Sequence, residues 1–208
     1  MLTNIFYSTF RNVWPMLFIF TIIIVSIRLF FIFYNKEKFT FYKELLMFFF
    51  IIYILLLYYI VTFQDNNYGT NNFIPFKEIF RYNITSRLFF KNVLGNIVLF
   101  IPFGIFVTHY VKNKKIYPTL ILSFLVSVSI EFTQSVIGRT ADIDDVILNL
   151  LGGILGYFIY KEFNTITSKL PKIMKTEVFL DLLSLFLILG LIFVSFKYNF
   201  WRFFSWTM

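Results

Sequence analysis

Long runs of apolar residues, separated by short polar stretches, dominate the hydrophobic pattern of this chain. A transmembrane helix needs about 20 predominantly apolar residues. Five runs clearly reach that length, at residues 13–34, 45–63, 93–111, 117–137 and 178–196. A sixth, 143–160, is shorter and opens with carboxylates, but it would still cross a thin bilayer with some tilt. The pattern predicts an all-α fold, a polytopic transmembrane helical bundle of five to six membrane helices.

The connection at 64–92 changes character along its length. Residues 64–72 are polar and typical of turns, whereas residues 73–90 interleave aromatic side chains with cations. That interleaving fits a helix lying in the headgroup layer, and an irregular loop with some buried aromatics fits it equally well. We therefore expect two N-terminal membrane helices in 1–63, this connection in 64–92, a helical core in 93–160, and a basic loop with a C-terminal membrane helix in 161–208.

Composition supports a membrane protein. Of 208 residues 59% are hydrophobic and only 14% are charged, and the mean hydropathy is +0.77. These values exclude a soluble enzyme and a disordered tail, and the absence of cysteine excludes disulfides, thiolate metal sites and cysteine nucleophiles. The net charge of +8 comes from cations that lie between apolar runs. We expect the partner of these cations to be the lipid bilayer and not a nucleic acid.

Orientation follows from the distribution of lysine and arginine between alternate connections. Ten cations fall in one set: Lys36, Lys38, Lys43, Lys112, Lys114, Lys115, Lys161, Lys169, Lys172 and Lys175. Eight fall in the other: Arg11, Lys77, Arg81, Arg87, Lys91, Arg139, Lys197 and Arg202. The difference predicts a multi-pass protein of the cell membrane with both termini, and the connection containing Arg139, on the outer face.

Polar side chains occupy one face of the fourth apolar run. Ser123, Ser127, Glu131 and Gln134 follow one another at helical spacing, surrounded by apolar residues. An ionised acid at the centre of a membrane helix costs roughly 2.5 to 3.5 kcal/mol on insertion scales. We therefore expect Glu131 to face protein or water, and we expect no capping role at its depth. It is the strongest candidate for function.

Two neighbouring runs offer matching polar faces. Asp142, Asp145 and Asn149 line the start of the fifth run, and Asn96 lies in the third. Gly152, Gly153 and Gly156 follow along the fifth run, where small residues allow helices to approach closely. Simpler roles remain open, since Asp142 could cap the following helix and Asn96 could bond one helix to another. We predict that the three polar faces meet in a common interior.

The acids in this region outnumber the cations. Glu131, Asp142, Asp144 and Asp145 lie close in sequence to a single cation, Arg139. A retained proton on Glu131, an ion pair with Arg139, or a cationic substrate group would each compensate the charge. A divalent cation held by Glu131, Asp142 and Asp145 is a further alternative.

At these residues the chain resembles the VanZ-like family. The matching blocks are Asn-Phe-Ile-Pro-Phe at 72–76, Asn-Val-Leu-Gly-Asn-Ile-Val-Leu-Phe-Ile-Pro-Phe-Gly at 92–104, Glu-Phe-Thr-Gln at 131–134, Gly-Arg-Thr-Ala-Asp-Ile-Asp-Asp at 138–145 and Asn-Leu-Leu-Gly-Gly-Ile-Leu-Gly at 149–156. The resemblance covers about residues 73–160. It implies an integral membrane protein of the Gram-positive cell envelope and a link to teicoplanin resistance, without implying a reaction.

Three functions remain open at this point. The protein could lower susceptibility to teicoplanin-type lipoglycopeptides, with the antibiotic or a lipid-linked envelope precursor as its partner. It could instead be an intramembrane enzyme, in which Glu131 transfers a proton, Asp142 and Asp145 hold a divalent cation, and Arg139 binds phosphate. A small lipid or solute transporter, in which Glu131 titrates, is the third.

Overall fold

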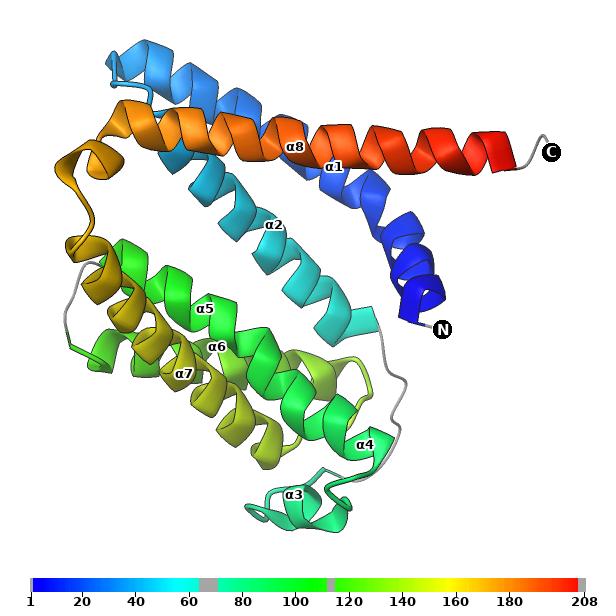
Figure 1. Ribbon diagram of the computed structural model, residues 1–208. Helices are drawn as coiled ribbons and strands as arrows, with labels where there is room; N and C mark the ends of the chain where they lie inside the picture. The colour runs from blue at the N-terminus through cyan, green and yellow to red at the C-terminus, as the bar shows by residue number, and fades with distance from the viewer. Residues whose placement is uncertain (1, 64–70, 112–114, 206–208) are drawn as a thin grey trace. The chain divides into compact units, whose positions relative to one another are not determined.

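The computed structural model describes the backbone of residues 2–63, 71–111 and 115–205, and the side chains of residues 13–60, 71–111 and 115–194. Over these residues its regular secondary structure is helical (Figure 1), and one isolated bridge lies outside the helices. Predictions that concern residues 64–70, Lys112 and Lys114, and the side chains of Arg11, Lys197 and Arg202, lie outside the described part of the chain.

Six helices in the described chain are long and apolar enough to cross a membrane, which confirms the predicted all-α bundle. The spans are Val13–Asn35, Phe41–Ile60, Arg87–Val111, Tyr117–Val136, Ile143–Ser168 and Glu177–Val194. The third span begins earlier than the sequence suggested. Helix α4 (Arg87–Phe89) passes through a π-helical turn (Phe90–Leu94) directly into α5 (Gly95–Val111). The fifth, α7 (Ile143–Ser168), continues eight residues beyond the expected end at Tyr160.

Residues 73–90 do not form one continuous helix. They contain a five-residue helix, α3 (Lys77–Arg81), and then the start of the third span at α4. A turn region separates the two, and Ser86 caps α4 by accepting a hydrogen bond from the backbone N–H of Phe89 (3.1 Å). The segment therefore combines a short helix with irregular chain.

The contacts divide the chain into two compact units. The first comprises residues 1–52 and 169–208, and so contains α1 (Leu2–Asn35), the start of α2 (Phe41–Phe63), a 3₁₀ turn (Lys172–Lys175) and α8 (Glu177–Ser205). Arg28 of α1 forms an ion pair with Glu44 of α2 (2.8 Å). Lys38 and Lys43 both pair with Glu177 at the first turn of α8. Ion pairs therefore connect the helix ends of this unit.

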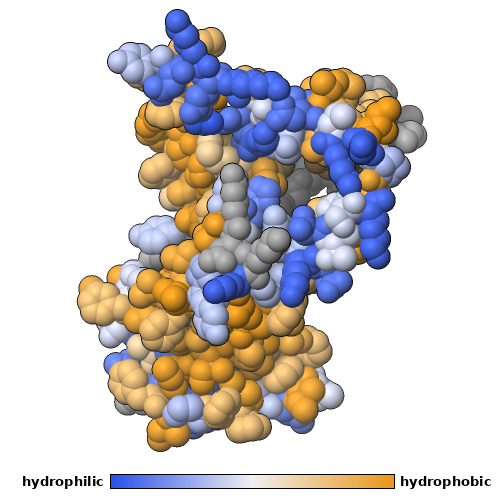
Figure 2. All heavy atoms as spheres, turned by 90° about the vertical axis from the view of Figure 1, so that its left-hand side faces the viewer, coloured by the Kyte–Doolittle hydropathy of each residue, from blue (hydrophilic) through white to orange (hydrophobic). Residues whose placement is uncertain are grey.

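The second unit, residues 53–168, is built on α5, α6 (Tyr117–Val136) and α7, which pack against one another. The second half of α2 packs on α5, where Leu57 joins a buried cluster with Phe100, Phe103 and Val107. The Tyr53 hydroxyl also donates to the carbonyl oxygen of Leu99 (2.6 Å). Hydrophobic residues cover most of the visible surface of this unit in Figure 2, as expected where lipid surrounds a protein.

Glycines bring the backbones of α5 and α7 together. A Cβ atom at Gly152 would overlap the carbonyl oxygen of Ile97, and one at Gly156 would overlap that of Ile101. Gly153 faces the other neighbour, because a Cβ there would overlap the Ser123 hydroxyl of α6. The predicted packing role of Gly152, Gly153 and Gly156 agrees with this geometry.

Replacing Gly156 by alanine should therefore destabilise the second unit. The added methyl group has only the backbone of α5 before it, and overpacking of this kind costs about 1–3 kcal/mol. The matched control is Gly190→Ala in α8, where nothing lies within 4 Å of the new atom. Thermal unfolding of detergent-solubilised protein should show a lower midpoint for Gly156→Ala alone; equal midpoints for the two variants would contradict close packing at Gly156.

Candidate functional site

The buried face of α6 consists entirely of polar residues. The buried residues of this helix are Thr119, Ser123, Ser127, Glu131 and Gln134. Leu125, Phe132 and Val136, on its other faces, are exposed. A soluble helix has the opposite arrangement, so α6 directs its polar groups into protein and its apolar groups into lipid. The face predicted from Ser123 to Gln134 is confirmed as the buried one.

Hydrogen bonds connect this face to α7 and α5. Asn149 of α7 donates its side-chain amide to the Ser127 hydroxyl (2.8 Å), with both residues buried. Nearer the other end of α6, the hydroxyls of Thr108 and Thr119 lie 3.0 Å apart, and Thr108 also donates to the carbonyl of Gly104 (2.6 Å). These pairs satisfy polar groups that hydrocarbon could not.

Asp145 of α7 meets Asn96 of α5. The Asn96 side-chain amide donates to Oδ1 of Asp145 at 2.6 Å, and the contact is partly buried. Asn96 thus bonds one helix to another, as one of the simpler interpretations proposed. Together with Ser127 and Asn149, this pair brings the predicted polar faces of α5, α6 and α7 into one interior.

Glu131 is bonded to Asp142, a residue of the neighbouring polar face, through a backbone group and not a side chain. Its Oε2 accepts a hydrogen bond from the backbone N–H of Asp142 at 2.7 Å. After α6 ends, the chain turns at Gly138, whose φ of 82° favours glycine, and returns to α6 at Asp142. Glu131 therefore faces protein, as expected, and its partner is a backbone N–H group of the returning loop.

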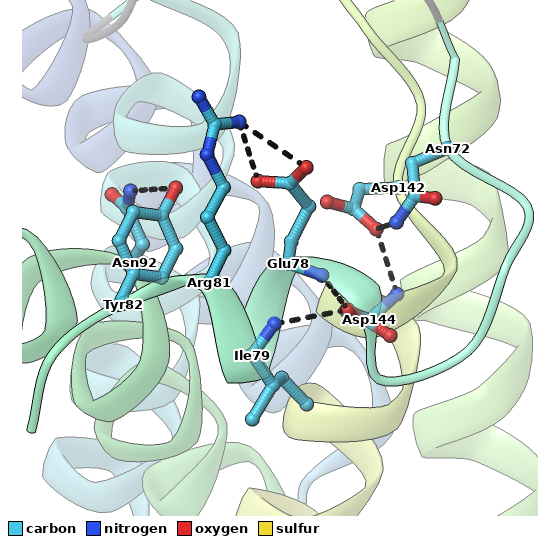
Figure 3. Close-up of polar contacts among 8 residues, drawn as sticks. All are labelled: Asn72, Glu78, Ile79, Arg81, Tyr82, Asn92, Asp142 and Asp144. Carbon is cyan, nitrogen blue, oxygen red and sulfur yellow. Dashed lines mark hydrogen bonds and ion pairs between the residues drawn. The ribbon is translucent and has the colours of Figure 1, made fainter.

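Asp142 caps α7. Its Oδ1 accepts from the backbone N–H of Asp144 (2.9 Å), two residues inside the helix, and from the side-chain amide of Asn72 (2.9 Å) (Figure 3). Burial raises the pKa of Asp142 above its ordinary value, while these two hydrogen bonds act in the opposite direction. The capping interpretation of Asp142 agrees with this geometry.

Asp144 is the main residue that sequence reasoning missed. It is 1% exposed, and its carboxylate accepts the backbone N–H groups of Glu78 (2.7 Å) and Ile79 (3.1 Å), which Figure 3 shows. It also accepts the backbone N–H of Phe76. These bonds hold the start of α3 against α7. They also hold Phe76 in the left-handed region at φ 66°, a conformation that costs about 1–3 kcal/mol in a bulky residue.

Asn72 was also not predicted as a site residue, although it belongs to a quoted family block. Its backbone forms a parallel bridge to the start of α7, with Asn72 N–H donating to Ala141 O (2.9 Å) and Ile143 N–H donating to Asn72 O (3.0 Å). Periodicity gave no signal for Asn72 or Asp144, since neither bond follows a helical repeat. The available indications were the dense run of acids at 142–145 and the family blocks at 72–76 and 138–145.

Arg139 and Gln134 lie at the end of α6, where the backbone N–H of Arg139 donates to the carbonyl of Gln134 (2.9 Å). Gln134 is buried and Arg139 is half-buried. Among the described side chains, no group of three or more histidines, aspartates and glutamates is arranged to hold a metal ion. Glu131, Asp142 and Asp145 lie near one end of the unit, where hydrogen bonds to protein groups position them.

These features define a class of protein: a polytopic helical membrane protein in which three helices enclose a polar, glycine-packed interior. Residues 49–167 match the VanZ/LLP1 family, and the chain belongs to that family. It is 32% identical over 102 residues to Protein VanZ of Enterococcus faecium, a match that covers 48% of this chain and 62% of that protein. The match thus spans less than two thirds of the relative. No solved structure matches the chain.

Substituting Asp144 with alanine should release α3 from α7. The change leaves the N–H groups of Phe76, Glu78 and Ile79 without their acceptor, and hydrogen bonds to a charged group contribute about 1.5–3 kcal/mol each. Hydrogen exchange measured by mass spectrometry should accelerate in residues 76–79. Glu78→Gln, which breaks the ion pair with Arg81 but keeps the backbone N–H of residue 78, is the control and should leave the exchange slow. Unchanged exchange in the Asp144→Ala protein would rule out this role of Asp144.

Proposed function

We propose that this VanZ-like membrane protein lowers the susceptibility of its cell to teicoplanin-type lipoglycopeptides, through the carboxylates at the α6–α7 end of the three-helix unit. The observation that carries the proposal is the gathering of Glu131, Asp142 and Asp145 at that end, where each carboxyl group accepts a hydrogen bond from another part of the unit or of the connection. Its family membership supports the same proposal, because the matched region contains all three acids.

The chemistry of such antibiotics fits an acidic site at a membrane boundary. A lipid chain partitions into the bilayer and brings the attached peptide to the level where the helices end. There, partly buried carboxylates attract cationic groups more strongly than they would in water. The same two features would also draw a lipid-linked envelope precursor, so both are partners within this proposal.

The proposal requires the α6–α7 connection to face outward. The lysines of the alternate connections favour this orientation, and Asp142 and Asp145 would then lie at the outer surface. An antibiotic arriving from outside would meet these acids without crossing the membrane.

Susceptibility measurements test the role of the acids. Cells carrying the wild-type chain, Glu131→Gln, Asp145→Asn or no copy are compared for teicoplanin and vancomycin at equal protein abundance. Both substitutions keep an acceptor oxygen for the N–H of Asp142 or for the Asn96 amide, and each replaces a carboxyl group by an amide that cannot ionise. We expect the wild type to lower teicoplanin susceptibility and both variants to lose most of that effect, with vancomycin, which lacks a lipid chain, less affected.

The control is Glu162→Gln, which removes an exposed charge from the far end of α7. This variant should protect as well as the wild type. Equal susceptibility of the wild-type and empty strains would remove the proposed function for this chain. Full protection by Glu131→Gln and Asp145→Asn would instead show that these two acids have no part in the protection.

A further inference from the structure

The segment of residues 73–90, here called the aromatic segment, exposes large apolar side chains outside the core. Phe80 is 83% exposed, Phe73 72% and Ile84 71%. Helix α3 has no buried residue, so it is held by backbone hydrogen bonds to Asp144 and not by side-chain packing. An exposed apolar patch of this kind marks a surface that another phase or partner covers.

Both ends of this segment place it at the membrane boundary. Helix α3 donates backbone N–H groups to Asp144, the second residue of the α7 span, so α3 lies within hydrogen-bonding distance of the point where that span begins. On its other side the segment runs into the span that begins at Arg87. Only five residues, 82–86, separate α3 from that span, and they reach at most about 17 Å when extended.

The segment carries an excess of positive charge, which favours contact with an anionic surface. Between residues 73 and 91 the chain carries four cations and one acid; the cations are Lys77, Arg81, Arg87 and Lys91, and the acid is Glu78. The nearby carboxylate of Asp144 is buried beneath backbone N–H groups. Cations close to a membrane attract acidic headgroups, and exposed aromatic rings insert at the same level.

We propose that the aromatic segment binds the anionic phospholipid surface of the membrane, with Phe80 and Ile84 inserted among the acyl chains and Lys77 and Arg81 contacting headgroup phosphates. Asp144 then serves to hold this surface at the correct level, since its bonds fix α3 against the end of α7. The segment anchors the α6–α7 end of the unit in one leaflet. This role is independent of any antibiotic or precursor.

Spin labelling tests the proposal directly, because the chain contains no cysteine. A nitroxide is attached to Phe80→Cys or Ile84→Cys in the full-length protein, and its collisions with oxygen and with a water-soluble nickel complex are compared. Leu125→Cys, exposed in the middle of the α6 span, is the lipid reference, and Lys172→Cys, in an exposed turn, is the water reference. Vesicles contain phosphatidylcholine alone or with phosphatidylglycerol.

We expect oxygen-favoured collisions at both segment positions, between the values of the two references, and a deeper Phe80 label when phosphatidylglycerol is present. Adding Lys77→Gln and Arg81→Gln to the Phe80→Cys protein should abolish that deepening. Labels at Phe80 and Ile84 that behave like the one at Lys172 would overturn insertion. An equal depth in the two vesicle types would overturn binding to anionic headgroups.

Discussion

A polar group in hydrocarbon must find its hydrogen-bonding partner within the protein, since an unpaired one costs several kcal/mol. This constraint explains the three-helix unit. Asn149 bonds Ser127, Asn96 bonds Asp145, and the carboxylate of Glu131 receives a backbone N–H from the returning loop. Such bonds require short distances between helices, and the glycines of α7 provide them by removing side chains from the contact with α5. The hydrogen bonds of the polar faces therefore depend on the close packing that the glycines allow.

The same requirement organises the end of the unit. Asp142 caps α7 and also receives the Asn72 amide, so the start of that helix and the chain preceding α3 are bonded together. Asp144 adds three backbone N–H groups and holds α3. One connected set of hydrogen bonds thus extends from Glu131 inside α6 to the aromatic segment. Replacing one of these acids by alanine would both remove its carboxyl group and release the segments that it holds. Substitution by glutamine or asparagine keeps an acceptor oxygen for the hydrogen bond, so it separates the two effects.

Features that repeat along the helix could be predicted from the sequence. Apolar length identified the six spans, and helical spacing placed Ser127, Glu131 and Gln134 on one buried face. Contacts between distant segments could not be predicted in this way. Asp144 contacts backbone groups 65 to 68 residues away, and its role depends on a loop path that no periodicity encodes. Asp142 was expected beside Glu131, but the use of its backbone N–H as the donor depends on the same loop path. The early start of the third span depends on a π-helical turn, which the residue pattern does not mark.

The central functional claim is that the acids at the α6–α7 end are reached from outside the cell. Labelling of single cysteines in intact cells with a membrane-impermeant maleimide tests it most directly, in the cysteine-free chain with Thr140→Cys or Lys172→Cys at opposite ends of α7. We predict that Thr140→Cys is labelled in intact cells and that Lys172→Cys is labelled only after permeabilisation. The reverse pattern would place the acids inside and contradict a direct encounter with an external glycopeptide.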